Sequence, residues 1–282
     1  MRFTKMHGAG NDYVLMDARD LEEDWATLAR AMCDRHMGVG ADGVLLVLPS
    51  DEANVRMRML NPDGSEAEMC GNGIRCLAKY VLEREIAENG KDPLSVETLN
   101  GVRLIEPLWS GGLVERARVA MGAPELRPER VPVAVSDDMS GGPVLDFPLD
   151  VDGHLLNLTF VSMGNPHAVA FIDTLVADFP LARIGPQVEH HRIFPKKVNF
   201  SIVNVRDSGA VVARVWERGA GETLACGTGA CAIAVAARLH GFTGEDVDIT
   251  LPGGTLSISW DGSGEVYMEG PAEEVFEGVW HA

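Results

Sequence analysis

The sequence lacks any long apolar run and any cluster of basic residues. No stretch approaches the roughly 20 apolar residues that a membrane-spanning helix needs, and the N-terminal segment MRFTKMHGAGNDYVLMD lacks the zones of a signal peptide. We therefore expect a cytoplasmic protein. Its 24 basic residues face 42 acidic ones, a formal net charge of −18. Nucleic acids and anionic membrane surfaces would be repelled, so we expect neither as a partner.

Cysteine is also scarce. Five cysteines in 282 residues are an odd number, spread too thinly to form a disulfide framework, so we expect reduced thiols. The length favours two domains, and a hydrophobic content of 46% is enough for a core in each.

Two of the five cysteines share one local pattern. Cys70 lies in EMCGNGIRC and Cys226 lies in LACGTGAC, so each begins a Cys-Gly-x-Gly motif. The segments that follow, residues 73–88 and 229–240, have helical periodicity. A third, peripheral helix is expected over residues 24–32. The pattern places both cysteines at helix N-termini.

Short apolar runs between Gly, Asn and Asp indicate strands elsewhere, for example at residues 44–48, 55–60 and 156–161. Turn sequences between such runs predict antiparallel hairpins. These turns lie at Asn100-Gly101, Asp152-Gly153, residues 207–209 and residues 252–254.

The chain contains an internal repeat. The segment GNDYVLMD around Asn11 is echoed by GNPHAVAFID around Asn165, at an offset of 154, and the two cysteine motifs repeat at an offset of 156. Two features with nearly one offset predict a duplicated domain. The least periodic segment, residues 122–142, lies where the halves should meet. We predict domains at 1–122 and 123–267, with a C-terminal strand in 268–282 that returns to the first.

A matched pair of cysteines suits inversion of a stereocentre. A helix N-terminus favours the thiolate, and the following glycines let backbone N–H groups approach an anion. If the two motifs faced each other across a cleft between the domains, one thiolate could remove an α-proton and one thiol could return a proton to the other face. The N–H donors would stabilise the carbanion without an organic cofactor.

Five segments, in this order, resemble motifs of the diaminopimelate epimerase family: MHGAGNDYVLMD, NPDGSEAEMCGNGIRC, GNPHAVAF, KKVNF and WERGAGETLACGTGA. The resemblance runs from the N-terminus past residue 235. It implies interconversion of LL- and meso-2,6-diaminopimelate in lysine and peptidoglycan precursor synthesis, with no cofactor and no metal. It also implies a homodimer. The implied fold is α+β (mixed α/β), with two duplicated domains, each a curved, largely antiparallel sheet around a central helix, and the active site in the cleft between them.

The resemblance assigns roles to residues. Cys70 and Cys226 match the catalytic acid and base, and His167 and Glu217 match polar partners of the thiols. The residues that match substrate-binding positions are Asn11, Asn61, Gly71, Asn72, Asn165, Asn199, Glu217, Arg218, Gly227 and Thr228. Of these, the two residues after each cysteine match a cradle for the carboxylate at the reacting centre.

One position departs from the family pattern. Some members carry a glutamine where this chain has Gly43, and that side chain contributes to the site there. Gly43 cannot supply it, so we do not include Gly43 among the site residues.

Other readings stay open from the residues alone. A related cofactor-independent racemase or epimerase for proline, hydroxyproline or another amino acid would use the same two thiols. A thiol-redox protein would cycle Cys70 and Cys226, although no Cys-x-x-Cys pair is present. A binding module without turnover would leave the two thiols without a purpose. The cysteine spacings do not form a zinc pattern, and Cys33, Cys76 and Cys231 fit buried packing roles.

Overall fold

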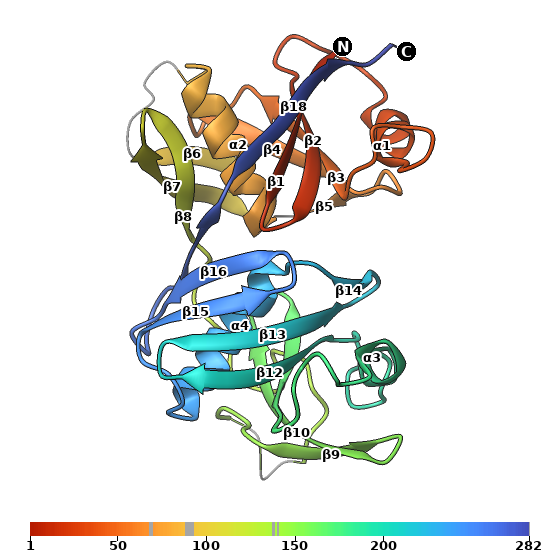
Figure 1. Ribbon diagram of the computed structural model, residues 1–282, viewed down its shortest axis with the longest axis vertical. Helices are drawn as coiled ribbons and strands as arrows, with labels where there is room; N and C mark the ends of the chain where they lie inside the picture. The colour runs from red at the N-terminus through yellow and green to blue at the C-terminus, as the bar shows by residue number, and fades with distance from the viewer. Residues whose placement is uncertain (68–69, 88–92, 137–138, 140, 282) are drawn as a thin grey trace. The chain divides into compact units, whose positions relative to one another are not determined.

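The computed structural model describes residues 1–67, 70–87, 93–136, 139 and 141–281. The chain divides into two compact units (Figure 1): unit 1 consists of residues 1–120 and 269–282, and unit 2 consists of residues 121–268. The predicted domain bounds, residues 1–122 and 123–267 with a C-terminal strand in 268–282 that returns to the first domain, stay a prediction.

Unit 1 is a sheet that surrounds one helix. Its elements are β1 (Arg2–Gly8), β2 (Asn11–Asp17), α1 (Trp25–Cys33), β3 (Gly43–Leu48), β4 (Val55–Leu60), β5 (Glu66–Ala67), α2 (Gly71–Glu83), β6 (Leu94–Thr98), β7 (Gly101–Ser110), β8 (Leu113–Ala120) and β18 (Glu273–Val279). The last strand, β18, pairs antiparallel with β1, so the two ends of the chain share one sheet. Strand β17 (Tyr267–Pro271) crosses the boundary between the units.

Unit 2 repeats this plan. Its elements are β9 (Phe147–Val151), β10 (His154–Ser162), β11 (Pro166–Phe171), α3 (Leu181–Glu189), β12 (Asn199–Asp207), β13 (Ala210–Glu217), β14 (Gly221–Thr223), α4 (Gly227–Leu239), β15 (Asp246–Leu251) and β16 (Gly254–Ser259).

The order of strand pairings is the same in both units. In unit 1, β1–β2 is antiparallel, β2–β3 parallel, β3–β4 antiparallel and β4–β6 parallel. In unit 2, β10–β11 is antiparallel, β11–β12 parallel, β12–β13 antiparallel and β13–β15 parallel. The predicted mixed α/β fold with an internal duplication is therefore confirmed.

Each sheet curves because it packs around a central helix. Helix α2 contacts β1, β2, β3, β4, β7 and β8, and α4 contacts β10, β11, β12, β15 and β16. Every residue of α2 from Gly71 to Leu82 is buried. Burial of each large apolar side chain contributes about 1.5–3 kcal/mol, so these contacts rather than helix propensity hold α2 and α4 in place.

The four predicted hairpins all form antiparallel pairs, namely β6–β7, β9–β10, β12–β13 and β15–β16. The helix boundaries differ from the predicted ones. Helices α2 and α4 begin directly after the cysteines, two residues earlier than expected, because the glycines form the first helical turn rather than a loop before it. Helix α2 ends at Glu83, with Arg84 as its C-cap, so the predicted helical span over residues 84–87 is wrong; residue 88, the last one predicted, lies outside the described residues.

Helix α3 was not predicted. It contains Gly185 and Pro186, which break a helical pattern in sequence. Among the described residues, no helix is both long enough and apolar enough to cross a membrane.

Candidate active site

Cys70 caps the N-terminus of α2. Its backbone is extended, with φ −136° and ψ 115°, and the helix begins at the next residue. The Ile74 N–H donates to the Cys70 carbonyl at 2.9 Å, which closes the first turn. The preceding N–H groups of the helix have no intrahelical acceptor, so this end of α2 favours a negative group.

The Cys70 sulfur contacts residues from β2. The Tyr13 hydroxyl lies 2.9 Å from Cys70 Sγ and also donates to Asn11 Oδ1. Asn72 Nδ2 donates to the same Asn11 oxygen at 3.2 Å. Gly10, with φ 82°, turns the chain from β1 into β2 and so delivers Asn11 to this position. The start of β2 and the start of α2 therefore form one cluster.

Arg75 supports the cluster from inside unit 1. Its side chain is fully buried, and it donates to Asn72 Oδ1 and the Gly71 carbonyl, each at 3.0 Å, and to the Pro271 carbonyl at 3.3 Å. A guanidinium suits this place because it offers several donors in a fixed plane. Arg75 thereby fixes the two residues that follow Cys70.

A group of charged residues anchors the other side of Asn11. Asp42 Oδ2 accepts from Asn11 Nδ2 at 2.6 Å, and Asp42 Oδ1 accepts from Arg35 at 2.6 Å. Asp12 bonds both Lys5 and Arg35. Burial raises the pKa of Asp12, but the hydrogen bonds from Arg35 and Lys5 outweigh it and lower the pKa to about 2. The orientation of the Asn11 amide is therefore fixed by Asp42.

Cys226 occupies the matching place in unit 2. It caps α4 with φ −123° and ψ 109°, and its Sγ accepts from the Gly229 N–H at 3.4 Å. The Thr228 hydroxyl lies 3.6 Å from the same sulfur. A Cβ at residue 229 would lie 3.2 Å from that sulfur, so glycine lets the helix backbone approach the thiol.

Cys226 is held as a thiol. Burial raises the pKa of Cys226 well above its ordinary value, and the Glu217 carboxylate raises it further, against smaller lowering by Thr228 and the Gly229 N–H. This direction is opposite to the thiolate character expected from a helix N-terminus alone, because burial outweighs the helix dipole. Glu217, at the end of β13, is thus a neighbour that favours the protonated form of Cys226.

His167 and Asn165 support Cys226 through Thr228. Asn165 Nδ2 donates to Thr228 Oγ1 at 3.2 Å, and Asn165 Oδ1 accepts from His167 Nε2 at 2.9 Å. His167 is fully buried, and burial, followed by the positive charge of Arg218, lowers its pKa to about 3. Its Nδ1 has no hydrogen-bond partner among the described residues. His167 is therefore a neutral imidazole with one unused acceptor.

Two strands place the remaining predicted residues of unit 2. Asn199, at the start of β12, donates to the Pro166 carbonyl at 2.9 Å and accepts from the Arg218 N–H at 2.9 Å. Glu217 accepts from the Thr223 hydroxyl at 2.5 Å. The Arg218 side chain donates to the Lys196 carbonyl at 3.1 Å and is exposed. Asn199 thus joins the start of β11 to the end of β13.

The two clusters match position by position. Asn11 and Asn165 each bond the residue two places after the cysteine of their unit, Asn72 or Thr228. Tyr13 and His167 each bond their asparagine from two residues further along the strand. Sequence reasoning missed Tyr13. The internal repeat carries the signal, because Tyr13 and His167 are 154 residues apart, the same offset as the asparagines.

Asn61 and Gly43 lie outside the two hydrogen-bonded clusters. Asn61 lies in the turn after β4, where its Nδ2 donates to Ser65 Oγ at 3.0 Å. Its hydrogen bonds stay in this turn and do not join the Cys70 cluster. Gly43 lies at the start of β3, where a Cβ would be 2.9 Å from the Leu60 carbonyl oxygen. The strand pairing therefore leaves no room for a larger side chain there.

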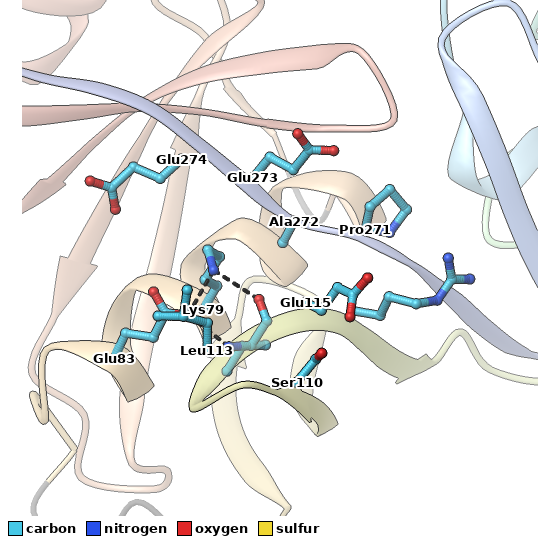
Figure 2. Close-up of a pocket in the computed structure, with 11 residues that line it drawn as sticks. Lys79, Glu83, Ser110, Leu113, Glu115, Pro271, Ala272, Glu273 and Glu274 are labelled. Carbon is cyan, nitrogen blue, oxygen red and sulfur yellow. Dashed lines mark hydrogen bonds and ion pairs between the residues drawn. The ribbon is translucent and has the colours of Figure 1, made fainter.

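Unit 1 also has a hollow of about 800 Å³ beside α2, β8 and the start of β18 (Figure 2). Lys79 lies in it and bonds Glu83 at 2.6 Å and the Val114 carbonyl at 2.8 Å. None of the predicted site residues lines this hollow. Among the described residues, no group of three or more His, Cys, Asp and Glu side chains is arranged to hold a metal ion.

Comparisons with known proteins identify the family of the chain. A family model described as diaminopimelate epimerase matches residues 3–126 and 159–275. A diaminopimelate epimerase of Desulfovibrio desulfuricans is 51% identical over 285 residues, covering 100% of this chain and 98% of the relative. One of Moorella thermoacetica is 50% identical over 281 residues, covering 99% of this chain and 98% of the relative.

The crystal structure of a probable proline racemase from Agrobacterium radiobacter K84 superimposes with a TM-score of 0.70 at 15% identity, covering 99% of this chain and 92% of that one. This likeness shows the fold alone. The family match and the two relatives show more: the chain belongs to the diaminopimelate epimerase family.

Proposed function

We propose that this chain is an isomerase that interconverts LL- and meso-2,6-diaminopimelate, with Cys70 and Cys226 as the two proton-transfer groups. The observation that carries the two-thiol assignment is the matched placement of the cysteines, each at the N-terminus of a buried central helix and each bonded to equivalent neighbours. This activity belongs to lysine and peptidoglycan precursor synthesis, and we place it in the cytoplasm of the cell. A homodimer is the assembly that we propose.

The chemistry needs two groups on opposite faces of one α-carbon. One cysteine, as thiolate, removes the α-proton and becomes a thiol. The electron pair of the broken C–H bond delocalises onto the substrate carboxylate. The other cysteine, as thiol, donates its proton to the opposite face and becomes a thiolate. The reverse reaction exchanges the two roles, so each turnover leaves the pair ready for the other stereoisomer.

The proton must leave one thiol before catalysis. Glu217 interacts with the Cys226 thiol and raises its pKa, so its carboxylate keeps the proton on Cys226 and favours Cys226 as the thiol of the pair. The low pKa of His167 keeps its imidazole neutral, and its bond to Asn165 supports Thr228 beside the Cys226 sulfur. We therefore assign Glu217 and His167 as polar partners of the Cys226 thiol.

We propose that the substrate carboxylate at the reacting centre binds at the helix N-termini. The N–H groups at the start of α2 and α4 belong to Gly71 and Asn72 in unit 1 and to Gly227 and Thr228 in unit 2, and they act as an oxyanion hole for the enolate-like charge. The second amino acid head of the substrate is polar and needs polar partners. For this end we propose the side chains of Asn11, Asn61, Asn165, Asn199, Glu217 and Arg218.

A substrate panel tests the proposal. Purified, reduced protein is incubated with LL-diaminopimelate, L-proline, trans-4-hydroxy-L-proline and L-lysine, and stereoisomers are separated by chiral chromatography. We expect inversion of diaminopimelate only. Inversion of proline or hydroxyproline instead would assign a related racemase activity to the chain. If no substrate is inverted after full reduction, the thiol-redox alternative would be favoured.

A further inference from the structure

Tyr13 is the nearer of two hydrogen-bond partners that β2 offers to the Cys70 sulfur, the other being Asn11 Oδ1 at 4.0 Å. Its hydroxyl lies 2.9 Å from Cys70 Sγ. Its side chain is fully buried in β2, and a Cβ at Gly73 would lie 3.5 Å from its ring. The ring is therefore packed against the first turn of α2, and the hydroxyl has little freedom to move away from the sulfur.

The direction of this hydrogen bond follows from the residues behind it. Asp42 accepts from Asn11 Nδ2 at 2.6 Å, so the nitrogen of the Asn11 amide faces Asp42 and its oxygen faces Tyr13. That oxygen can only accept. The one proton of the Tyr13 hydroxyl is thus used in the bond to Asn11, and the lone pairs of the hydroxyl face the sulfur.

Burial also keeps the hydroxyl protonated. Burial raises the pKa of Tyr13 well above its ordinary value. A neutral phenol whose proton is donated elsewhere can only accept from a thiol. It stabilises the S–H form of Cys70 and sets the direction in which the S–H bond points.

We propose that Tyr13 is a positioning residue for Cys70. Tyr13 holds Cys70 as an oriented thiol through the series of hydrogen bonds Asp42–Asn11–Tyr13. The inference rests on the proposed function, in which Cys70 transfers the proton. The matching position in unit 2, His167, bonds Asn165 in the same way. The duplication has thus kept one architecture and placed a phenol in one half and an imidazole in the other.

The test measures the protonation of Cys70 without turnover. Wild type, Tyr13→Phe and Tyr80→Phe are alkylated with iodoacetamide between pH 6 and pH 10, and labelling of the Cys70 peptide is followed by mass spectrometry. Only the thiolate reacts. Loss of an acceptor for S–H destabilises the thiol form, so the midpoint for Tyr13→Phe should fall by about half to one pH unit. Tyr80 lies on α2 and stacks on Arg84, so Tyr80→Phe should keep the wild-type midpoint.

A midpoint that stays in place or moves to higher pH in Tyr13→Phe would overturn the inference, because the hydroxyl would then be neutral toward the thiol or a donor to the thiolate. Infrared spectroscopy gives a second readout at fixed pH. The S–H stretching band that Cys70→Ala removes should move to higher wavenumber in Tyr13→Phe, and an unmoved band contradicts the proposal. Neither readout uses diaminopimelate, so failure of the inference is distinct from failure of the proposed function, which the substrate panel reports.

Discussion

At the scale of single residues, the neighbours of the Cys226 sulfur have opposing effects on its pKa. For Cys226, burial and Glu217 favour the thiol, whereas Thr228 and the Gly229 N–H favour the thiolate. A group in such a balance can change protonation when a substrate carboxylate enters or a nearby charge changes. The protein therefore does not need a sulfur that is permanently ionised.

Removal of either thiol should stop inversion. Cys70→Ala and Cys226→Ala should each lower kcat by about 10²- to 10⁴-fold, the usual contribution of a general acid or base, while circular dichroism and the thermal midpoint stay near wild type. The control is Cys33→Ala in α1, a buried cysteine whose pKa burial raises to about 11; it should keep its activity. A single mutant with near-full turnover would rule out the two-thiol mechanism.

His167 should make stability depend on pH. Its pKa in the folded protein, about 3, lies below the ordinary value of 6.5, so below pH 6.5 the unfolded chain binds a proton that the folded protein does not. The stability from the neutral imidazole is present above pH 6.5 and is lost as the pH falls toward 3, at up to about 1.4 kcal/mol per pH unit.

Urea unfolding of wild type and His167→Gln at pH 7, 6, 5 and 4 measures this slope. The variant should show a flatter decline than wild type, and His281→Gln, at the exposed end of the chain, should not change it. An equal slope in wild type and His167→Gln would show that His167 does not titrate in this way.

Sequence could identify the cysteines but not all of their neighbours. Repetition and flanking glycines mark Cys70 and Cys226 without any structure. Tyr13 and Asp42 lie 57 and 28 residues before Cys70, and only the packing of α2 against β2 and the pairing of β2 with β3 bring them together. Their role depends on tertiary geometry, which hydrophobic periodicity does not contain.

At the scale of elements, the cysteine helices need glycine close to the sulfur. Gly229→Ala would place a Cβ 3.2 Å from Cys226 Sγ, which is tighter than ordinary van der Waals contact and should displace the sulfur by a few tenths of an ångström. Since misplacement by about 1 Å costs ~100-fold, we expect kcat to fall about tenfold with little change in KM.

Gly244→Ala is the matched control, because a Cβ there has no neighbour within 4 Å. It should keep the wild-type kcat. Steady-state kinetics on wild type, Gly229→Ala and Gly244→Ala tests this prediction. An unchanged kcat in Gly229→Ala would mean that the position of the Cys226 sulfur tolerates this contact.

The same scale shows which parts of the fold the sequence predicts. Hairpins are local, so the Asn100-Gly101 and Asp152-Gly153 turns indicate their strand pairs directly. The parallel pairs β2–β3 and β4–β6 have no such local signal, since a helix or a long segment separates their strands. Helix α3 escaped prediction because Gly185 packs against the Trp216 ring, a tertiary reason for a residue that helices otherwise disfavour.

At the scale of the whole molecule, the duplicated units supply one thiol each, and the proposed reaction requires both thiols at one α-carbon. Mild oxidation with diamide in the absence of substrate should therefore link Cys70 to Cys226. Activity should fall with formation of the link and return with dithiothreitol, and diaminopimelate should protect. Peptide mass spectrometry under non-reducing conditions detects the link. Failure to form it, with both cysteines reactive toward iodoacetamide, would contradict the proposed placement, since a disulfide needs Cα atoms within about 7 Å.

The two-base mechanism is tested most directly by the fate of the α-proton in heavy water. LL-diaminopimelate is converted by reduced protein in D₂O, and both stereoisomers are analysed by mass spectrometry during the first few per cent of reaction. Two thiols predict that newly formed meso product carries deuterium at the inverted α-carbon, while the remaining LL substrate stays unlabelled, because the donor thiol has exchanged with solvent and the abstracting thiol has not. Protium retained in the product, or deuterium appearing equally in substrate and product, would show that a single group serves both faces and would contradict the account.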